Sequence, residues 1–380
     1  MEENRSLKIL HVISGGDTGG AKTHVIALLT KLKQKVNVDL VCFMEGVFTE
    51  EAKSNGIHTI IYSQRNRFDI FSIVKLSHRI NREKYDLIHC HGARANFVAM
   101  FLKLLCKVPI VTTIHSDYKL DFQSNLFKKI VFTNMNALSL RFMDYYIGVS
   151  NSFKNMMIER GFPEHKVFTV YNGIEIKEKI DHISREAFFN KYGISYNKPH
   201  IYVGIIARLH PVKGHRIFIG AAVKAYEKNK NLRFIIAGDG AEEGRLKEYV
   251  KQLGMEHVIY FVGFIDNPYD YFNAIDINTL TSFSESFPYV LLEGAMMKKA
   301  TIASRVGGIR DIIIDGKTGY GFEPGDINGL SDCILQLTAS EEKRTTMGIN
   351  LYDHLVENFS IEKMIDTHIT IYREILKDEK

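Results

Sequence analysis

The sequence predicts an α/β protein made of two Rossmann-like domains, and three observations support this fold class. Short apolar, β-branched runs alternate with amphipathic, helix-length segments along nearly the whole chain, which is typical of βαβ units in a parallel sheet. The 380 residues are enough for two domains of similar size at roughly 150 residues each. The alternation pauses once, at residues 175–199, and then resumes. We therefore expect two wound halves that face each other across a cleft.

The first half is expected to contain seven strands with helices between them. Residues 9–14, Ile-Leu-His-Val-Ile-Ser, show the near-continuous apolar character of strands that are buried on both faces. The strands are predicted at residues 8–14, 39–43, 59–63, 86–91, 110–115, 145–150 and 167–171, and helices include 21–32, 71–80 and 95–105.

The polar stretch at residues 175–199 is helix-forming around 185–192, and we interpret it as an interdomain linker. The strands predicted after it lie at residues 201–207, 233–238, 258–263, 277–282, 300–304 and 319–322, and the sequence is helical in pattern from residue 328. The predicted domains are residues 1–178 and 179–359. We expect a C-terminal helix at 360–380 to return to the first domain.

Composition excludes several classes of protein. Apolar residues make up 45% and charged residues 24% of the chain, which argues against wholesale disorder. No run approaches the roughly 20 apolar residues of a membrane span, and the acidic N-terminus does not resemble a secretory signal. The four cysteines form no CxxC pair and suggest no disulfide framework; they are Cys42, Cys90, Cys106 and Cys333. We expect a cytoplasmic protein.

The net charge of +5 is unevenly placed. Residues 1–180 hold 25 Lys and Arg against 17 Asp and Glu, whereas the remainder holds 24 against 27. A basic first half suggests an anionic partner, and basic residues interleaved with apolar ones near residues 100–130 suggest an anionic membrane surface. These basic residues are Lys103, Lys107, Lys119, Lys128 and Lys129. The alternative is a merely solvated surface, and we expect no nucleic-acid partner.

A glycine-rich segment, Gly15-Gly16-Asp17-Thr18-Gly19-Gly20, follows the first predicted strand and precedes a helix. Glycines let a ligand approach the backbone, and a helix N-terminus offers free N–H groups to an anion. The segment is not GxGxxG, and no acid stands where a ribose would need one. A nicotinamide cofactor is therefore not expected; the alternative to an anion site is a tight turn without a ligand.

A second motif, at residues 207–214, follows the first strand of the second half and reads Ala-Arg-Leu-His-Pro-Val-Lys-Gly. It places the guanidinium of Arg208 and the ammonium of Lys213 in one loop that leads into a helix. Two such cations beside a helix start suit a diphosphate. The alternative is a pair of solvated basic residues.

The most specific motif spans Glu285–Glu293 and reads Glu-Ser-Phe-Pro-Tyr-Val-Leu-Leu-Glu. Pro288 suits the first helical position, after which Tyr289 and Val290 would present free N–H groups at a positive helix end. The two carboxylates could each accept two hydroxyl groups of a sugar or ribose. Glu293 lies in an apolar run, where an unpaired charge is costly, which argues against an ordinary surface glutamate.

His89, Cys90, His91 and His115 are residue types that can bind a metal ion. Neighbouring residues on a strand point to opposite faces, so His89-Cys90-His91 cannot chelate as a run, and we expect no metal site. His115 ends a predicted strand, so its imidazole could project into the cleft, or it could be a satisfied structural histidine.

In order along the chain, these motifs resemble those of the retaining glycosyltransferases of family 4, which have the GT-B fold. The resemblance rests on GGDTGGAKTHV near the start, HGARAN at 91–96, TTIHSD at 112–117, YNGIE at 171–175, ARLHPVKG at 207–214, AGDG at 237–240, VGFIDN at 262–267 and ESFPYVLLE at 285–293. The last block matches the family's E-x7-E pattern. Such enzymes move a sugar from a nucleotide diphosphate, usually without a metal, and retain the anomeric configuration.

The resemblance implies that residues 1–178 form the acceptor-side domain and residues 179–359 the nucleotide-sugar donor domain, and it implies a role for each matching residue. Arg208 and Lys213 would hold the donor diphosphate, Glu285 would bind the transferred sugar, and Glu293 would bind the ribose. Gly19 and Gly20 would close over the phosphates, and His115 would contact the donor sugar near the reacting centre. The remaining donor-binding residues would be Gly238, Phe287, Tyr289 and Val290.

The family resemblance also implies the partners: a UDP-sugar donor and a glycan or lipid-linked acceptor for cell-surface polysaccharide or glycoconjugate synthesis, with no cofactor. Two alternatives remain open, a GT-B nucleotide-sugar epimerase and a non-catalytic nucleotide-sugar-binding protein. The sequence departs from the family's usual Pro-Asn-Gly-[Ile/Val]-Asp at residues 171–175, and His210 has no assigned role.

Overall fold

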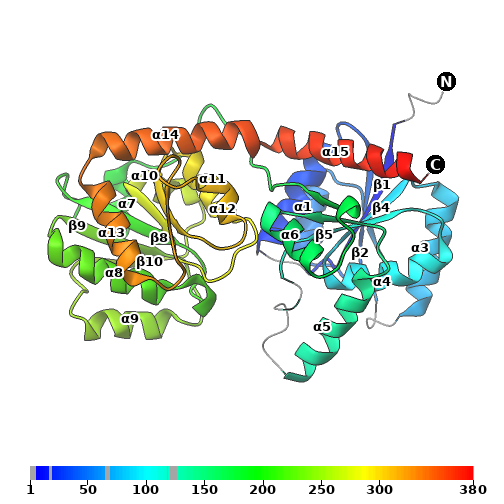
Figure 1. The fold of residues 1–380 in the computed structure, drawn as a ribbon, viewed down its shortest axis with the longest axis horizontal. Coiled ribbons are helices and arrows are strands. Elements are labelled where there is room, and N and C mark those ends of the chain that lie inside the picture. Colours follow the sequence, from blue (N-terminus) through cyan, green and yellow to red (C-terminus); the bar gives the residue numbers. More distant parts are fainter. Residues whose placement is uncertain (1–5, 17–18, 65–68, 118, 120–125, 380) are drawn as a thin grey trace. The chain divides into compact units, whose positions relative to one another are not determined.

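The computed structural model describes residues 6–16, 19–64, 69–117, 119 and 126–379, with no side-chain detail at 126–132. The chain divides into two compact units, one made of Met1–Gly173 with Ile361–Lys380 and the other of Ile174–Ser360 (Figure 1). Each unit has one parallel sheet with helices on both faces, which confirms the expected α/β fold class. We describe each unit by itself.

The first unit contains a seven-stranded parallel sheet in the order β3-β2-β1-β4-β5-β6-β7. All seven predicted strands form, with ends shifted by a few residues. They are β1 (Lys8–Ile13), β2 (Asn37–Cys42), β3 (Thr59–Ile61), β4 (Leu87–His91), β5 (Ile110–Ile114), β6 (Tyr145–Gly148) and β7 (Val167–Thr169). The order of the strands reverses between β1 and β4, and in open α/β sheets ligands bind beyond the carboxyl ends of the strands at such a point.

Residues of the central strands alternate between two apolar clusters, one on each face of the sheet. Ile9 and Ile13 of β1 pack under α1 and α15, whereas Leu10 and Val12 pack under α3 and α4. The helices are α1 (Gly19–Leu32), α2 (Val47–Ser54), α3 (Ile70–Glu83), α4 (Gly92–Leu105), α5 (Leu126–Leu140), α6 (Asn151–Glu159), the 3₁₀ turn η1 (Glu164–Lys166) and α15 (Ile361–Asp378). As predicted, the C-terminal helix returns to the first unit, where it packs beside α1.

The second unit contains a six-stranded parallel sheet in the order β10-β9-β8-β11-β12-β13. The strands coincide with the predicted ones and are β8 (Ile201–Ile206), β9 (Leu232–Ala237), β10 (Ile259–Gly263), β11 (Ile277–Leu280), β12 (Ala300–Ser304) and β13 (Tyr320–Phe322). The order reverses between β8 and β11, so the loops that follow these two strands meet at the carboxyl edge of the sheet. Two of the three sequence motifs lie in these loops.

The helices of the second unit cover both faces of its sheet, with α8, α9 and α13 on one face and α7 and α10 on the other. They are α7 (Arg185–Lys191), the 3₁₀ turn η2 (Pro211–Lys213), α8 (His215–Lys228), α9 (Glu243–Gln252), α10 (Pro268–Ala274), α11 (Tyr289–Met296), α12 (Ile309–Ile312), α13 (Ile327–Thr338) and α14 (Glu341–Asn358).

The interpretation of residues 175–199 as a linker was wrong. Helix α7 in this segment packs on α10, and Phe188 and Phe189 are fully buried in the second unit. The Arg185 guanidinium binds both carboxylate oxygens of Asp276, at 2.9 and 2.6 Å. The segment is therefore part of the second unit. Its polar composition gave no indication that Phe188 and Phe189 are buried.

Candidate active site

The loop after β8 rests directly on the loop after β9. The backbone N–H of Leu209 donates to the Asp239 carbonyl at 2.6 Å. Gly238 has φ +121°, and a Cβ there would lie 2.1 Å from the carbonyl oxygen of Ala207. Only glycine fits at such an approach. Gly238, a predicted donor-binding residue, therefore allows the loop after β9 to pack against the backbone of the loop that carries Arg208.

The same loop ends in the 3₁₀ turn η2, which leads into α8. The His210 ring accepts a hydrogen bond from the Val212 N–H at 3.3 Å and caps this turn, which gives a role to a residue that had none. Gly214, with φ +66°, joins η2 to α8. The Thr281 hydroxyl after β11 donates to the Lys213 carbonyl at 2.8 Å, so the loops after β8 and β11 are tied together.

Lys213 and Glu285 meet in an ion pair between these two loops. Nζ of Lys213 lies 2.5 Å from Oε1 of Glu285, and the side chains are 21% and 10% exposed. The Ser282 hydroxyl donates to the same carboxylate oxygen at 2.6 Å. The second and third sequence motifs are thus one site, with a cation and a carboxylate fixed in a partly buried position.

Arg208 lies in the same loop but is exposed. Its side chain forms no hydrogen bond or ion pair with any residue that the structure describes, whereas its backbone carbonyl accepts a hydrogen bond from the His210 N–H at 2.8 Å. Its guanidinium is therefore an available cation beside Lys213, whose charge already has a carboxylate partner.

The loop that positions Glu285 is held by the glycine pair after β12. A Cβ at Gly307, which has φ +47°, would lie 1.7 Å from the Glu285 carbonyl oxygen. The Gly308 N–H donates to the Ser286 carbonyl at 2.9 Å. The close approach of Gly307 and the hydrogen bond from Gly308 hold the backbone at Glu285 and Ser286.

Helix α11 begins at Tyr289, with Pro288 as its N-cap, so proline stands one position earlier than predicted. The first N–H groups of a helix have no partner within the helix, which leaves those of Tyr289 and Val290 at its positive end.

Phe287 is buried and its ring packs against Phe359, with the ring centroids 5.1 Å apart. A donor contact from Phe287 would thus have to come from its backbone.

Glu293 lies just over one turn into α11 and is partly buried. Burial raises the pKa of its carboxyl group to about 7. Among the described residues no side chain forms an ion pair or hydrogen bond with it, and its charge contributes to the raised pKa values of Tyr269 and Tyr289. A carboxylate kept without a partner in such a position is poised to accept hydroxyl groups of a ligand.

The remaining predicted site residues, His115, Gly19 and Gly20, belong to the first unit. Gly19 has φ +65° and opens α1 together with Gly20, and a Cβ at either glycine would meet nothing within 4 Å. His115 follows β5 and is partly exposed; its Nε2 lies 3.1 Å from Nδ1 of His91. Burial, with a further contribution from His368, lowers the pKa of His115 to about 4, so its imidazole is neutral at pH 7.

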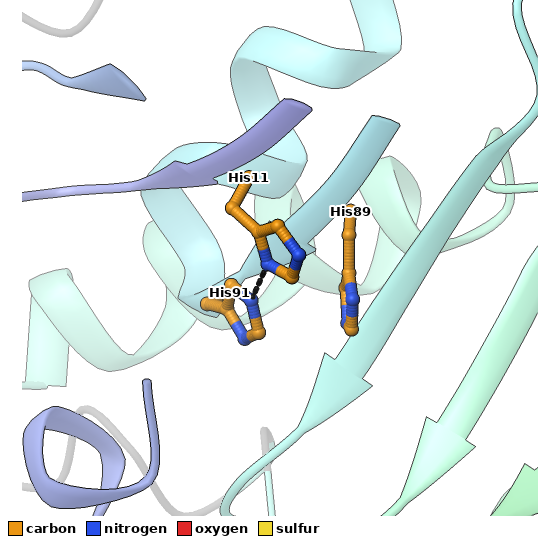
Figure 2. A group of neighbouring side chains, drawn as sticks. All are labelled: His11, His89 and His91. Carbon is orange, nitrogen blue, oxygen red and sulfur yellow. Dashed lines mark hydrogen bonds between the residues drawn. The ribbon is translucent and has the colours of Figure 1, made fainter. Parts of the chain in front are cut away.

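His115 is one of six histidines that lie together where α1 and α15 cover the sheet. We call them the histidine cluster: His11, His24, His89, His91, His115 and His368. Figure 2 shows three of them, with the 3.0 Å hydrogen bond between Nδ1 of His11 and Nε2 of His91. Burial lowers the pKa values of these histidines. They form a neutral polar layer inside the first unit.

The sequence reasoning missed this cluster because it treated residues 89–91 as a run of three. Cys90 does face the opposite side of the sheet, but His89 and His91 share one face. The strand register places His11 of β1 beside His89 of β4. The spacing of two residues between His89 and His91 was the available signal, whereas the pairing of β1 with β4 could not be seen in one sequence. The absence of a metal site stays a prediction. The argument that neighbouring strand residues point to opposite faces no longer supports it, because His89 and His91 share one face.

The basic surface expected near residues 100–130 is only partly described. Both carboxylate oxygens of Asp144 bind the Lys103 ammonium, at 2.6 and 2.7 Å, so Lys103 is not a free cation. Lys107 and Lys119 are exposed, as is Leu104 at 75%. The side chains of Lys128 and Lys129 lie outside the described residues. No helix in the described part of the chain is long and apolar enough to cross a membrane.

Comparison with known proteins agrees with this architecture. The family model for glycosyl transferases group 1 matches residues 184–354, and the model for glycosyltransferase family 4 matches residues 18–178. The N-acetyl-alpha-D-glucosaminyl L-malate synthase of Bacillus anthracis is 29% identical over 82% of this chain and 81% of its own. The UDP-Gal:alpha-D-GlcNAc-diphosphoundecaprenol alpha-1,3-galactosyltransferase of Escherichia coli is 22% identical over 90% of each chain.

Among solved structures, HepE of Anabaena in complex with UDP and glucose matches 97% of this chain and all of its own, with a TM-score of 0.81 and 21% identity. Two Rossmann-like units of this kind make up the GT-B fold. The chain belongs to the group 1 glycosyltransferases of family 4, as the sequence motifs predicted.

Proposed function

We propose that this chain is a retaining glycosyltransferase that moves a sugar from a UDP-sugar to a glycan or lipid-linked acceptor, in the synthesis of a cell-surface polysaccharide or glycoconjugate. The observation that supports it most is the convergence of Arg208, the Lys213–Glu285 ion pair and the start of α11 at the carboxyl edge of one sheet. Structures of HepE with UDP and with UDP-glucose support the choice of nucleotide.

The donor diphosphate would lie against Arg208 and Lys213, with the free N–H groups at the start of α11 directed at a phosphate. Fixed cations and helix N-termini are suited to anions because they need no reorganisation as charge develops. Glu293 would accept the ribose hydroxyls. These residues belong to one unit, so that unit alone supplies the groups needed to hold a nucleoside diphosphate.

In the transfer itself, the bond between the anomeric carbon and the diphosphate oxygen breaks, and Arg208 and Lys213 stabilise the charge on the departing UDP. A covalent intermediate would need an available carboxylate. Oε1 of Glu285 is held by Lys213 and Ser282, so we assign Glu285 to binding the transferred sugar. The acceptor oxygen then forms the new bond from the same face, and its proton passes to the departing phosphate.

Two cations at the diphosphate make a divalent metal unnecessary for this step, and we propose that transfer is metal-independent. His115, neutral at pH 7, would contact the donor sugar as a hydrogen-bonding group, and Gly19 and Gly20 would approach the phosphates. The basic first unit would take the acceptor and, through Lys107 and the exposed leucines near it, contact an anionic membrane at the cytoplasmic side.

The test is a screen of UDP-sugars with three acceptor classes: lipid-linked GlcNAc diphosphate, glycan fragments, and small hydroxy acids such as L-malate. The last class is included because the Bacillus anthracis relative is an N-acetyl-alpha-D-glucosaminyl L-malate synthase. We expect acceptor-dependent release of UDP, and an anomeric proton coupling in the product that shows retention. Epimerised donor without UDP release, or an untouched donor with every acceptor, would contradict the proposal.

A further inference from the structure

The histidine cluster contains two triads whose ring nitrogens lie close enough to bind one metal ion. One triad is His11, His89 and His91, and the other is His24, His91 and His115; in each, one ligand atom from every residue lies within 4.8 Å of the others. The transfer reaction uses His115 alone. The two triads differ in their hydrogen bonds, which allows a choice between them.

In the first triad, drawn in Figure 2, Nε2 of His11 has no hydrogen-bond partner among the described residues, but His89 offers no free ring nitrogen. His89 has both nitrogens engaged, Nδ1 with the Tyr372 hydroxyl at 2.6 Å and Nε2 with the Thr113 hydroxyl at 2.7 Å. Its ring is stacked on His91 at 4.3 Å with an interplanar angle of 28°. His89 could bind an ion only by giving up one of its two hydrogen bonds, which argues against this triad.

The second triad has a free ligand atom. Nδ1 of His24 lies 2.8 Å from Oδ1 of Asn172, and because an amide oxygen only accepts, Nδ1 carries the proton. Nε2 of His24 is left with its lone pair, is buried, and has no hydrogen-bond partner within the described part of the chain. Histidine ligands of metals commonly donate their second N–H to such an oxygen.

His91 and His115 complete the arrangement. Nδ1 of His91 lies 3.1 Å from Nε2 of His115, whereas two nitrogens bound to one tetrahedral zinc at about 2.0–2.1 Å each lie about 3.4 Å apart. With Nδ1 on a metal, His91 can still donate through Nε2 to Nδ1 of His11, at 3.0 Å. Two of the three ligands thus have an outer partner in place.

Two of the three ring pairs in this triad have the separation expected at one ion. The centroids of His24 and His115 are 4.9 Å apart and those of His91 and His115 are 5.4 Å apart, whereas those of His24 and His91 are 6.2 Å apart and would have to approach on binding. Imidazoles on one tetrahedral ion have centroids about 5 Å apart. His115 is partly exposed, which gives an ion a route to the two buried ligands.

We propose that His24, His91 and His115 bind a transition-metal ion, with Zn²⁺ as the best match to three neutral imidazoles. This differs from the sequence-based expectation of no metal site. The ion is not needed for transfer; it would occupy the ring nitrogen through which His115 faces His91 and would fix the His115 ring.

The test uses the full-length protein, treated with EDTA, dialysed, and titrated with Zn²⁺ in competition with a chromophoric chelator. We expect one ion per chain, and a tetrahedral visible absorption spectrum when Co²⁺ replaces Zn²⁺. His115→Gln should abolish both signals, as should His24→Gln if it folds. Asn172→Ala should weaken binding by about 10- to 100-fold, as for other outer partners of metal ligands.

Two matched controls separate this triad from other histidines. His89→Gln, whose amide can keep bonds to Tyr372 and Thr113, and His58→Ala, on the surface, should leave the affinity unchanged. Binding that survives His115→Gln, or that is lost in His89→Gln while the protein stays folded, would overturn the proposal, as would the absence of stoichiometric Zn²⁺ binding.

A second readout rests on the proposed function. Because the ion would hold His115, Zn²⁺ at stoichiometric levels should lower the turnover of the wild-type transferase and EDTA should restore it. Zinc binding is measured without any sugar donor, so a failure of the transfer reaction and a failure of the metal site can be told apart. Stoichiometric binding without any effect on turnover would refute the link to His115.

Discussion

Replacing Lys213 by methionine tests the ion pair that joins the two motifs of the second unit. The substitution keeps the length of the apolar stem and removes the ammonium, which leaves the Glu285 carboxylate with only the Ser282 hydroxyl. Exposed ion pairs contribute about 0.2–1 kcal/mol, whereas breaking a fully buried one costs about 3–5 kcal/mol. With side chains 21% and 10% exposed, we expect a cost of about 2 kcal/mol in the free energy of unfolding.

For a unit of this size, about 1 kcal/mol shifts the melting temperature by about 2–4 °C, so Lys213→Met should melt about 4–8 °C lower. The double variant Lys213→Met with Glu285→Gln leaves no uncompensated charge and should regain most of that loss. Turnover should behave differently: it should fall by about 10²-fold or more in the single variant and should not recover in the double variant.

The assays are thermal unfolding and UDP release with the best donor and acceptor from the screen. Lys247→Met is the control, since the ion pair of Lys247 with Glu243 is much more exposed, at 54% and 40%, and its loss should change neither stability nor turnover appreciably. Near-normal turnover in folded Lys213→Met would refute the diphosphate assignment. A double variant no more stable than the single one would refute the energetic reasoning.

The other predictions concern charge, metal, pH and membrane. Arg208→Ala should lower turnover by about 10²-fold without lowering stability, because the Arg208 side chain has no partner among the described residues; parallel turnover and melting measurements check this. Transfer should survive EDTA, and complete loss that Mg²⁺ or Mn²⁺ restores would contradict a metal-independent step. The pKa of Glu293 is about 7 in the folded protein and 4.5 as its ordinary value, so the native state binds more protons between these values and stability falls as pH rises through that window. Glu293→Gln should therefore be more stable than the wild type at pH 8, by up to about 3 kcal/mol, but not at pH 4, and should bind UDP more weakly; equal melting curves at pH 8 would refute the desolvation argument. Liposomes with anionic lipid should float the protein at low salt but not at high salt, and Lys107→Glu should weaken this; absence from the lipid fraction at both salt levels would leave the basic first half without this role.

Much of the fold could be predicted because strands buried on both faces have a distinctive local pattern. Runs such as residues 9–14 and 201–206 are almost continuously apolar, and the glycine-rich and proline-containing loops between elements end them clearly. The segment at 175–199 could not be interpreted from composition, because the burial of Phe188 and Phe189 depends on contacts with α10, far along the chain.

The candidate site was predictable in its residue types but not in its contacts. The motifs indicated two cations and two carboxylates near a helix start, yet the pairing of Lys213 with Glu285 arises only when β8 and β11 become neighbours. Phe287 was expected to bind the donor, and its ring is buried against Phe359, so such a contact would come from its backbone. The histidine cluster escaped notice for the same reason as the ion pair, since His11, His91 and His24 come together only through strand order and helix packing.

A crystal structure of the protein with UDP tests the central claim most directly. We predict the diphosphate against Arg208 and Lys213, a phosphate oxygen at the N–H groups of Tyr289 and Val290, and the ribose hydroxyls on Glu293. UDP bound elsewhere, with Arg208 and Lys213 making no contact to phosphate, would contradict the account.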